Sequence, residues 1–174
     1  MTDRISVALP HLRALNILSH LPPGDHPALD HLSALACALT GADAAAVVFL
    51  NDTGSAQVLG QDGVGWKICP LNARQVEGQA PLGQDHPLRS GAVDRLATIG
   101  LWPLRIDGAL VGALLAGQRG GSGTEAPSEN WAEGASPRLR PLADLAATQI
   151  AAELAMARLA RMAGAALGRG EDPP

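Results

Sequence analysis

The chain has 174 residues, of which 47% are hydrophobic and 17% charged, with a formal net charge of −4. This length and apolar content predict one globular domain and argue against an intrinsically disordered chain. The basic residues are scattered arginines with a single lysine, Lys67, so no basic stripe favours nucleic acid. No apolar run reaches the roughly 18 residues of a membrane span, and the first residues do not resemble a signal peptide. We therefore expect a cytoplasmic protein that binds neither nucleic acid nor membrane.

Two helices are predicted before the first strand. Residues 9–21 carry leucines at helical spacing and precede Pro22-Pro23-Gly24, so residues 1–24 read as a helix with a proline-rich connector. Pro27 suits the first turn of a second helix, and Gly41 suits the left-handed residue after its end. The predicted apolar stripe of this second helix consists of Leu29, Leu32, Leu35, Ala36 and Leu39.

Two hairpins follow. The unbroken apolar run at residues 44–50 predicts a central strand, which pairs with a strand around residues 57–59. In the second hairpin, residues 96–105 and 109–118 flank Asp107-Gly108, a pair that tolerates the positive φ angles of a tight turn. Pro103 cannot donate to a strand ladder, so we expect it at a bulge or on an edge strand.

Two irregular segments separate these elements. Residues 60–94 are rich in Gly, Pro and Gln, show only a hint of a helical turn at residues 85–91, and predict a covering loop. Residues 119–137 contain a Gly-Gly-Ser-Gly stretch and prolines, which predict a flexible surface loop with Trp131 as its one anchor. We expect deletion of residues 120–134 to leave the fold intact.

The last predicted element is a long helix at residues 138–167. Its apolar residues span an arc of roughly 220°, wider than the stripe of an ordinary surface helix, so something should cover it on two sides. Arg140, Asp144, Thr148 and Arg158 form the remaining polar face. Residues 168–174 are expected to be a disordered tail.

The element order predicts an α+β fold. It is an antiparallel β-sheet with N- and C-terminal helices packed on one face and a loop-rich cover on the other. Residues 29–50 resemble the opening helix and first strand of a GAF domain, LWPLRIDGALVGAL at residues 101–114 resembles its closing hairpin, and residues 142–151 resemble its last helix. The resemblance covers about residues 25–165 and implies a GAF-like domain over residues 25–167 that works as a sensor. It implies no particular ligand, and the cofactor stays undefined.

If the domain has a ligand pocket, we expect it between the open face of the sheet and the covering loop. The candidate contacts are Trp66, Cys69, His86, Arg89 and Trp102. The segment between the hairpins is shorter than in many relatives, which use helices there, so the pocket is reduced or absent. Members of this family that attach bilins or reduce free methionine sulfoxide carry reactive cysteines in this region, but Cys69 reproduces neither spacing.

The sequence indicates neither a metal site nor one of the common catalytic patterns. The five histidines lack i, i+4 spacing on one helix, and no second cysteine lies near Cys69, so we expect no metal site. Cys37 and Cys69 are interpreted as free thiols, both titratable after denaturation. No Ser/His/Asp order, carboxylate pair or phosphate-binding loop marks an enzyme.

Small residues on the Leu29–Leu39 helix suggest a helix partner. Ala34, Cys37 and Ala38 lie on its second face and permit close approach of another helix, although a cysteine facing solvent is the alternative. The wide apolar arc of residues 138–167 includes Met156 and Leu159. Together with the small residues, this arc predicts a homodimer formed through helices. The rival explanation is that the N-terminal helix covers the arc.

Three functions remain open. The first is a non-enzymatic regulatory domain that binds a small molecule or a partner protein in signal transduction. The others are a small thiol-dependent reductase that uses Cys69 and resembles free methionine sulfoxide reductases, and a pocketless dimerisation scaffold.

Overall fold

The computed structural model describes residues 26–50, 56–63, 65, 68–69, 71–78, 82, 96–120 and 130–167. The elements, in order, are α2 (Pro27–Thr40), β1 (Ala44–Leu50), β2 (Ala56–Asp62), β3 (Ile68–Cys69), α3 (Ala73–Gly78), β4 (Leu96–Ile106), β5 (Ala109–Arg119) and α5 (Trp131–Leu167). The predicted N-terminal helix, the helical turn at residues 85–91 and the tail at residues 168–174 lie outside the described residues.

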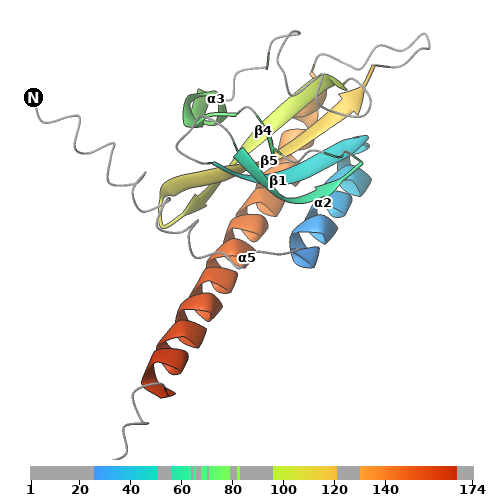
Figure 1. Cartoon of the computed structure of the whole chain (residues 1–174). Helices are drawn as coiled ribbons and strands as arrows, with labels where there is room; N and C mark the ends of the chain where they lie inside the picture. Colours follow the sequence, from blue (N-terminus) through green and yellow to red (C-terminus); the bar gives the residue numbers. More distant parts are fainter. Residues whose placement is uncertain are drawn as a thin grey trace, which may run out of the picture.

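The strands form one antiparallel sheet in the order β3-β2-β1-β5-β4 (Figure 1). All residues of β1 are buried, as expected for a strand that is paired on both edges and covered on both faces. The α+β sheet with its helices is the architecture that the element order predicts.

The β4–β5 hairpin is formed as its sequence predicts. Asp107 has φ 50° and Gly108 φ 77°, so both turn residues occupy the left-handed region that Asp-Gly tolerates. Pro103 lies opposite Ala113 on β4, which is an edge strand of the described sheet. An edge position explains how a residue without an N–H group fits in this strand.

Helices α2 and α5 pack side by side on one face of the sheet (Figure 1). Hydrogen bonds at both ends of α2 show that the two helices are antiparallel. His26, just before α2, lies 2.7 Å from Glu153 through its Nδ1 atom, whereas Trp131 Nε1 donates to the Thr40 carbonyl at 3.1 Å at the other end. The first half of α5 therefore covers the sheet.

The buried side of α2 is rotated from the predicted stripe. Leu29, Ser33 and Ala36 are fully buried, whereas Leu35 and Leu39 are each 42% exposed. Ser33 tolerates burial because its hydroxyl donates to the Leu29 carbonyl at 3.0 Å. The stripe prediction was therefore wrong for Leu35 and Leu39, which face outward.

Helix α5 begins earlier than predicted. Residues 131–137 belong to the helix and not to a flexible loop, with Pro137 and Pro141 inside it. Trp131 is half-buried, packs against the core and bonds to α2, so it fixes the first turn. Deletion of residues 120–134 would remove this anchor, so the contacts of Trp131 argue against the expectation that the fold survives it, which stays untested.

The covering segment between β2 and β4 also contains regular structure that was not predicted. Its residues form the short strand β3, paired with β2, and the one-turn helix α3, which contacts β4 and β5. Leu71 and Val76 of this segment are fully buried in the core. Short elements of this kind carry too few residues to show a period.

Candidate functional site

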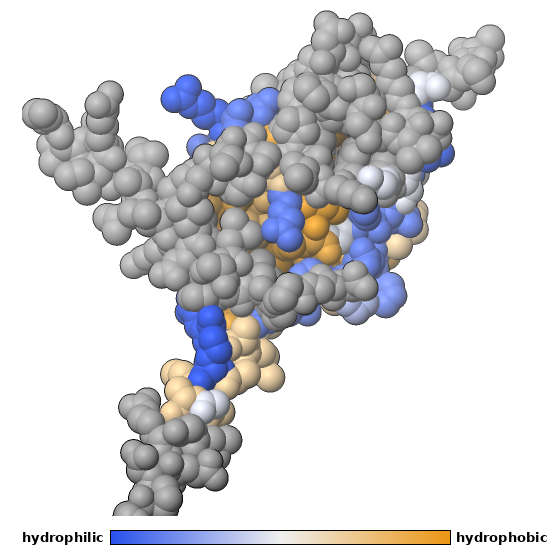
Figure 2. Space-filling view, in the orientation of Figure 1, coloured by the Kyte–Doolittle hydropathy of each residue, from blue (hydrophilic) through white to orange (hydrophobic). Residues whose placement is uncertain are grey.

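The register of the strands shows which side chains share each face of the sheet. We call the face opposite α2 and α5 the far face. It carries alternate residues of each strand. Its central members are aliphatic and buried, and they are Ala46, Val48, Ile99, Leu101, Ala113 and Leu115. Several are alanines, which have short side chains. We call these six residues the apolar floor. Figure 2 shows hydrophobic residues at the centre of the face viewed in Figure 1.

Gln61 is a polar residue at the margin of this floor. It lies opposite Ala46 in the β1–β2 ladder and therefore shares the far face. Its Oε1 atom is buried and has no hydrogen-bond partner among the described residues, while its backbone N–H donates to Asp30 Oδ1 at 2.8 Å. An unpaired buried amide oxygen costs about 1–3 kcal/mol, which a ligand with a donor group would recover.

Sequence reasoning missed Gln61. A single glutamine in a segment rich in Gly and Gln carries no motif, and only the register of β2 against β1 places it on the apolar floor. The signal that was present is the alternation of β2, whose burial pattern is interrupted by the bulge between Val47 and Val48.

Trp102 does not belong to the far face. By register it lies opposite Leu114, on the helix-covered side, and only 4% of it is exposed. Its Nε1 atom donates to Ser136 Oγ at 3.2 Å, and its ring meets that of Trp131 edge to face, with centroids 6.5 Å apart. Trp102 therefore lies under α5 and not on the face where the pocket was expected, so its predicted location was wrong, and its role as a ligand contact stays untested.

The structure says little about the other four predicted ligand contacts. The backbone of Cys69 lies in β3, opposite Ala56. Trp66, His86 and Arg89 lie outside the described residues. These four residues stay predictions.

Cys37 is a half-buried thiol that faces β2. Burial, followed by the charge of Asp62 and a hydrogen bond to its carboxylate, raises the pKa of Cys37 from 9.0 to about 12. The thiol is therefore protonated and unreactive near neutral pH. Its placement against Asp62 also corrects its assignment to the outward face of α2, whereas Ala34 and Ala38 are exposed there.

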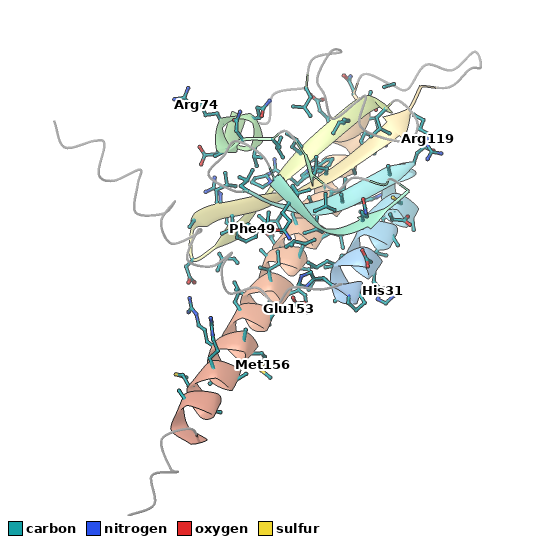
Figure 3. The ribbon with its side chains drawn as sticks, in the orientation of Figure 1. His31, Phe49, Arg74, Arg119, Glu153 and Met156 are labelled. Atoms are coloured by element: carbon teal, nitrogen blue, oxygen red, sulfur yellow. The ribbon has the colours of Figure 1, made fainter. Side chains whose placement is uncertain are left out.

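The two helices expose several large apolar side chains. We call these residues the outer helix face, and they are Leu35 and Leu39 of α2 with Leu145, Met156, Leu159 and Met162 of α5. Met156, Leu159 and Met162 are 67%, 56% and 62% exposed. They lie on residues 155–167, the distal third of α5, which projects past the sheet (Figures 1 and 3). The predicted interface residues Met156 and Leu159 are thus exposed.

The described residues contain neither a metal-binding cluster nor a membrane-spanning helix. No three His, Cys, Asp or Glu side chains in this part of the chain come together as a metal site. Among the same residues, no helix combines the length and apolar character needed to span a membrane.

The described residues form an α+β domain with an antiparallel sheet, a layer of two helices on one face and an apolar opposite face. This is the fold of GAF domains. The GAF-B domain of DevS from Mycobacterium smegmatis is similar, with a TM-score of 0.52 and 24% identity over 77% of this chain and 99% of that one.

Two further solved structures share the fold. The blue-light absorbing form of the PixJ GAF domain from Thermosynechococcus elongatus has a TM-score of 0.50 and 17% identity, covering 83% of this chain and 92% of its own. A domain of a predicted two-component sensor histidine kinase from Sinorhizobium meliloti 1021 has a TM-score of 0.52 and 12% identity, covering 81% and 99%. No family model and no curated protein matches the sequence.

Proposed function

We propose that the chain is a non-enzymatic, cytoplasmic regulatory domain that binds a small, mostly apolar molecule on the far face and acts as a homodimer. The unpaired buried amide oxygen of Gln61 beside an aliphatic floor carries the ligand part of this proposal. Small-molecule sites are commonly apolar clefts with a few polar groups that orient the ligand. The ligand class is therefore a compact apolar molecule with one hydrogen-bond donor.

Strand β4 connects the proposed ligand site on the far face to helix α5 on the other face. Leu101 lies on the far face, and the next residue, Trp102, lies on the helix face and is bonded to Ser136 of α5. A ligand that shifts β4 at Leu101 therefore moves Trp102 and, through it, the start of α5. Adjacent residues on a strand point to opposite faces, so this connection needs no further relay.

Thermal melting against a panel of small apolar metabolites tests the ligand part. Binding to the native state alone raises the melting temperature by an amount that grows with the logarithm of the ratio of ligand concentration to Kd. We expect one or more compounds to raise it, and Gln61→Leu to remove the response while leaving the unliganded protein folded. A panel that shifts neither protein would favour the pocketless scaffold.

The exposed outer helix face supports the homodimer. Exposed apolar patches beyond a few hundred Å² are uncommon on soluble monomers, and most homo-oligomers close as two-fold dimers. Light scattering across concentration measures the mass directly. Met156→Glu should dissociate the dimer, whereas Arg158→Glu, an exposed change on the other side of the same turn, should leave its mass unchanged. A monomeric wild-type protein at high micromolar concentration would end the homodimer proposal.

An enzyme assay addresses the thiol alternative. If Cys69 were the nucleophile of a reductase, the wild-type protein would reduce free methionine sulfoxide and Cys69→Ser would not. We expect no turnover by either protein.

A further inference from the structure

We propose that the last residues of β2 transmit occupancy of the far face to α5 through the first turn of α2. We call this set of contacts the α2 connection. It rests on the ligand site proposed at Gln61 and describes how that site is coupled to the rest of the molecule. It differs from the connection through β4, because it reaches α5 at Glu153, next to the distal third, and not at the first turns.

A bulge sets the end of β2 apart from the rest of the strand. In the β1–β2 ladder, Val58 and Gly60 face consecutive residues of β1, so Leu59 is the extra residue. A bulge interrupts the ladder locally and re-aims the side chains beside it. Residues 60–62 therefore form a short paired segment that is less tightly coupled to the start of the strand.

This segment contacts both sides of the sheet. Gln61 lies on the far face, where its Oε1 atom is buried without a hydrogen-bond partner among the described residues. Its neighbour Gly60 lies on the helix side, where a Cβ atom would be 2.7 Å from the backbone nitrogen of Asp30. The backbone of β2 therefore touches the backbone of α2, and no side chain between them absorbs a shift at Gln61.

Asp30 adds a direct bond between β2 and α2. The backbone N–H of Gln61 donates to Asp30 Oδ1 at 2.8 Å, at the edge of the strand that pairs with β3 only at Ala56 and Gln57 in the described sheet. The N–H of Asp30 in turn donates to the His26 carbonyl at 3.1 Å. Asp30 thus bonds both the end of β2 and the residue at which α2 begins.

His26 carries the connection to α5. It is buried, and its Nδ1 atom lies 2.7 Å from Glu153 Oε2, while Gln149 Nε2 donates to Glu153 Oε1 at 3.0 Å. Both oxygens of this carboxylate therefore have a partner, which fixes the side chain between the two helices. The next residue, Leu154, is buried, whereas Met156 is 67% exposed (Figure 3). The connection ends where α5 leaves the sheet.

The unpaired oxygen of Gln61 gives a ligand its effect on these contacts. A buried acceptor without a donor disfavours the present arrangement of residues 60–62, and a ligand that donates to it would hold them in place. Each further step is a hydrogen bond or a backbone contact, so the first turn of α2 and Glu153 are held as well. Occupancy is therefore expected to make α5 more rigid at this level.

Hydrogen exchange of the full chain tests the α2 connection without a ligand. Gln61→Leu has no unpaired oxygen and so mimics the occupied site. We expect amide exchange at residues 29–30 and 153–157 to slow by at least about threefold, because these amides exchange through local opening. Amides of β5 should not change. The matched control is Gln57→Leu, on the same strand before the bulge, which should change neither region.

Two further backgrounds test the order of the contacts. In Asp30→Ala, the change Gln61→Leu should alter neither α2 nor α5. In Glu153→Ala, it should still slow exchange at residues 29–30 but not at residues 153–157. Asp30→Asn keeps a side-chain oxygen that accepts from the Gln61 N–H group and should restore both effects.

Three outcomes would contradict the α2 connection. They are unchanged exchange at residues 153–157 in Gln61→Leu, equal slowing throughout the sheet, which would indicate a change in global stability, and an effect on α5 that survives Asp30→Ala. The ligand proposal fails separately. A metabolite panel that raises no melting temperature would remove the ligand, while exchange in Gln61→Leu would still decide the connection. A compound that binds but leaves exchange at residues 153–157 unchanged would preserve the ligand site and end the connection.

Discussion

Gly60 is the residue at which α2 comes closest to the sheet. A Cβ atom there would lie 2.4 Å from the Leu29 carbonyl carbon and 2.6 Å from Leu29 Cβ, so backbone would have to move. We expect Gly60→Ala to lower the free energy of unfolding by about 2 kcal/mol, as overpacking does. Gly134→Ala is the control, since nothing lies within 4 Å of its Cβ position, and it should stabilise by about 0.5–1 kcal/mol. Urea unfolding measures both, and equal midpoints for the two variants would contradict the close approach.

Cys37 provides a chemical test of the α2–β2 contact. Because its pKa is raised from 9.0 to about 12, the protonated thiol contributes stability below pH 9, which is lost as the pH rises towards 12. Alkylation of Cys37 by iodoacetamide, followed by peptide mass spectrometry, should be slow at pH 8. Asp62→Asn removes the repelling charge and lowers the pKa, so the rate should rise. An unchanged rate in this variant would show that Asp62 does not face the thiol.

At the scale of elements, Trp131 holds the start of α5. It combines the edge-to-face contact with Trp102 and a hydrogen bond to the Thr40 carbonyl, and it thereby links β4, α2 and α5. We expect Trp131→Ala to cost about 3 kcal/mol and Trp131→Phe, which keeps a ring but loses the N–H donor, about 1 kcal/mol. Thermal and urea unfolding would show this order. Equal losses would mean that the ring contributes nothing beyond the hydrogen bond.

Elements specified by local chemistry were predictable from the sequence. The Asp107-Gly108 turn and the Gly41 helix end depend on backbone angles that few residues adopt, and both have positive φ in the structure. The start of α5 was not predictable, because Pro137 and Pro141 oppose a helix locally. Its stability comes from Trp131, through contacts with residues distant in sequence.

The candidate site was less predictable than the fold. The element order predicts which side of the sheet could hold a pocket. Which residues lie on that side depends on the strand register, and a bulge at Val47/Val48 shifts this register. Trp102 was placed on the wrong face because its strand is buried on both faces and shows no alternation. Gln61 was missed for a different reason, because the bulge interrupts the alternation of β2, so the sequence does not show which of its side chains share a face.

At the scale of the whole molecule, α5 contacts β4 and α2 and also exposes an apolar surface. Its first third is bonded to β4 through Trp102 and Ser136, its middle to the start of α2 through Glu153 and His26, and its distal third exposes Met156. A rigid helix transmits a small movement at one end over its whole length. A change at the far face of the sheet can therefore alter the surface on which two copies are proposed to pair.

If the homodimer is the native state, its thermal unfolding must depend on protein concentration. Unfolding then separates two chains, so dilution favours the unfolded state by mass action. For a protomer of this size, we expect the melting temperature to fall by about 2 °C for each tenfold dilution. Met156→Glu places a charge on the exposed stripe, and its melting temperature should be lower and independent of concentration. Arg158→Glu should retain the wild-type slope, because Arg158 lies on the opposite side of the helix from Met156. A wild-type melting temperature that stays constant over a hundredfold dilution would show that the two copies do not pair in the native state.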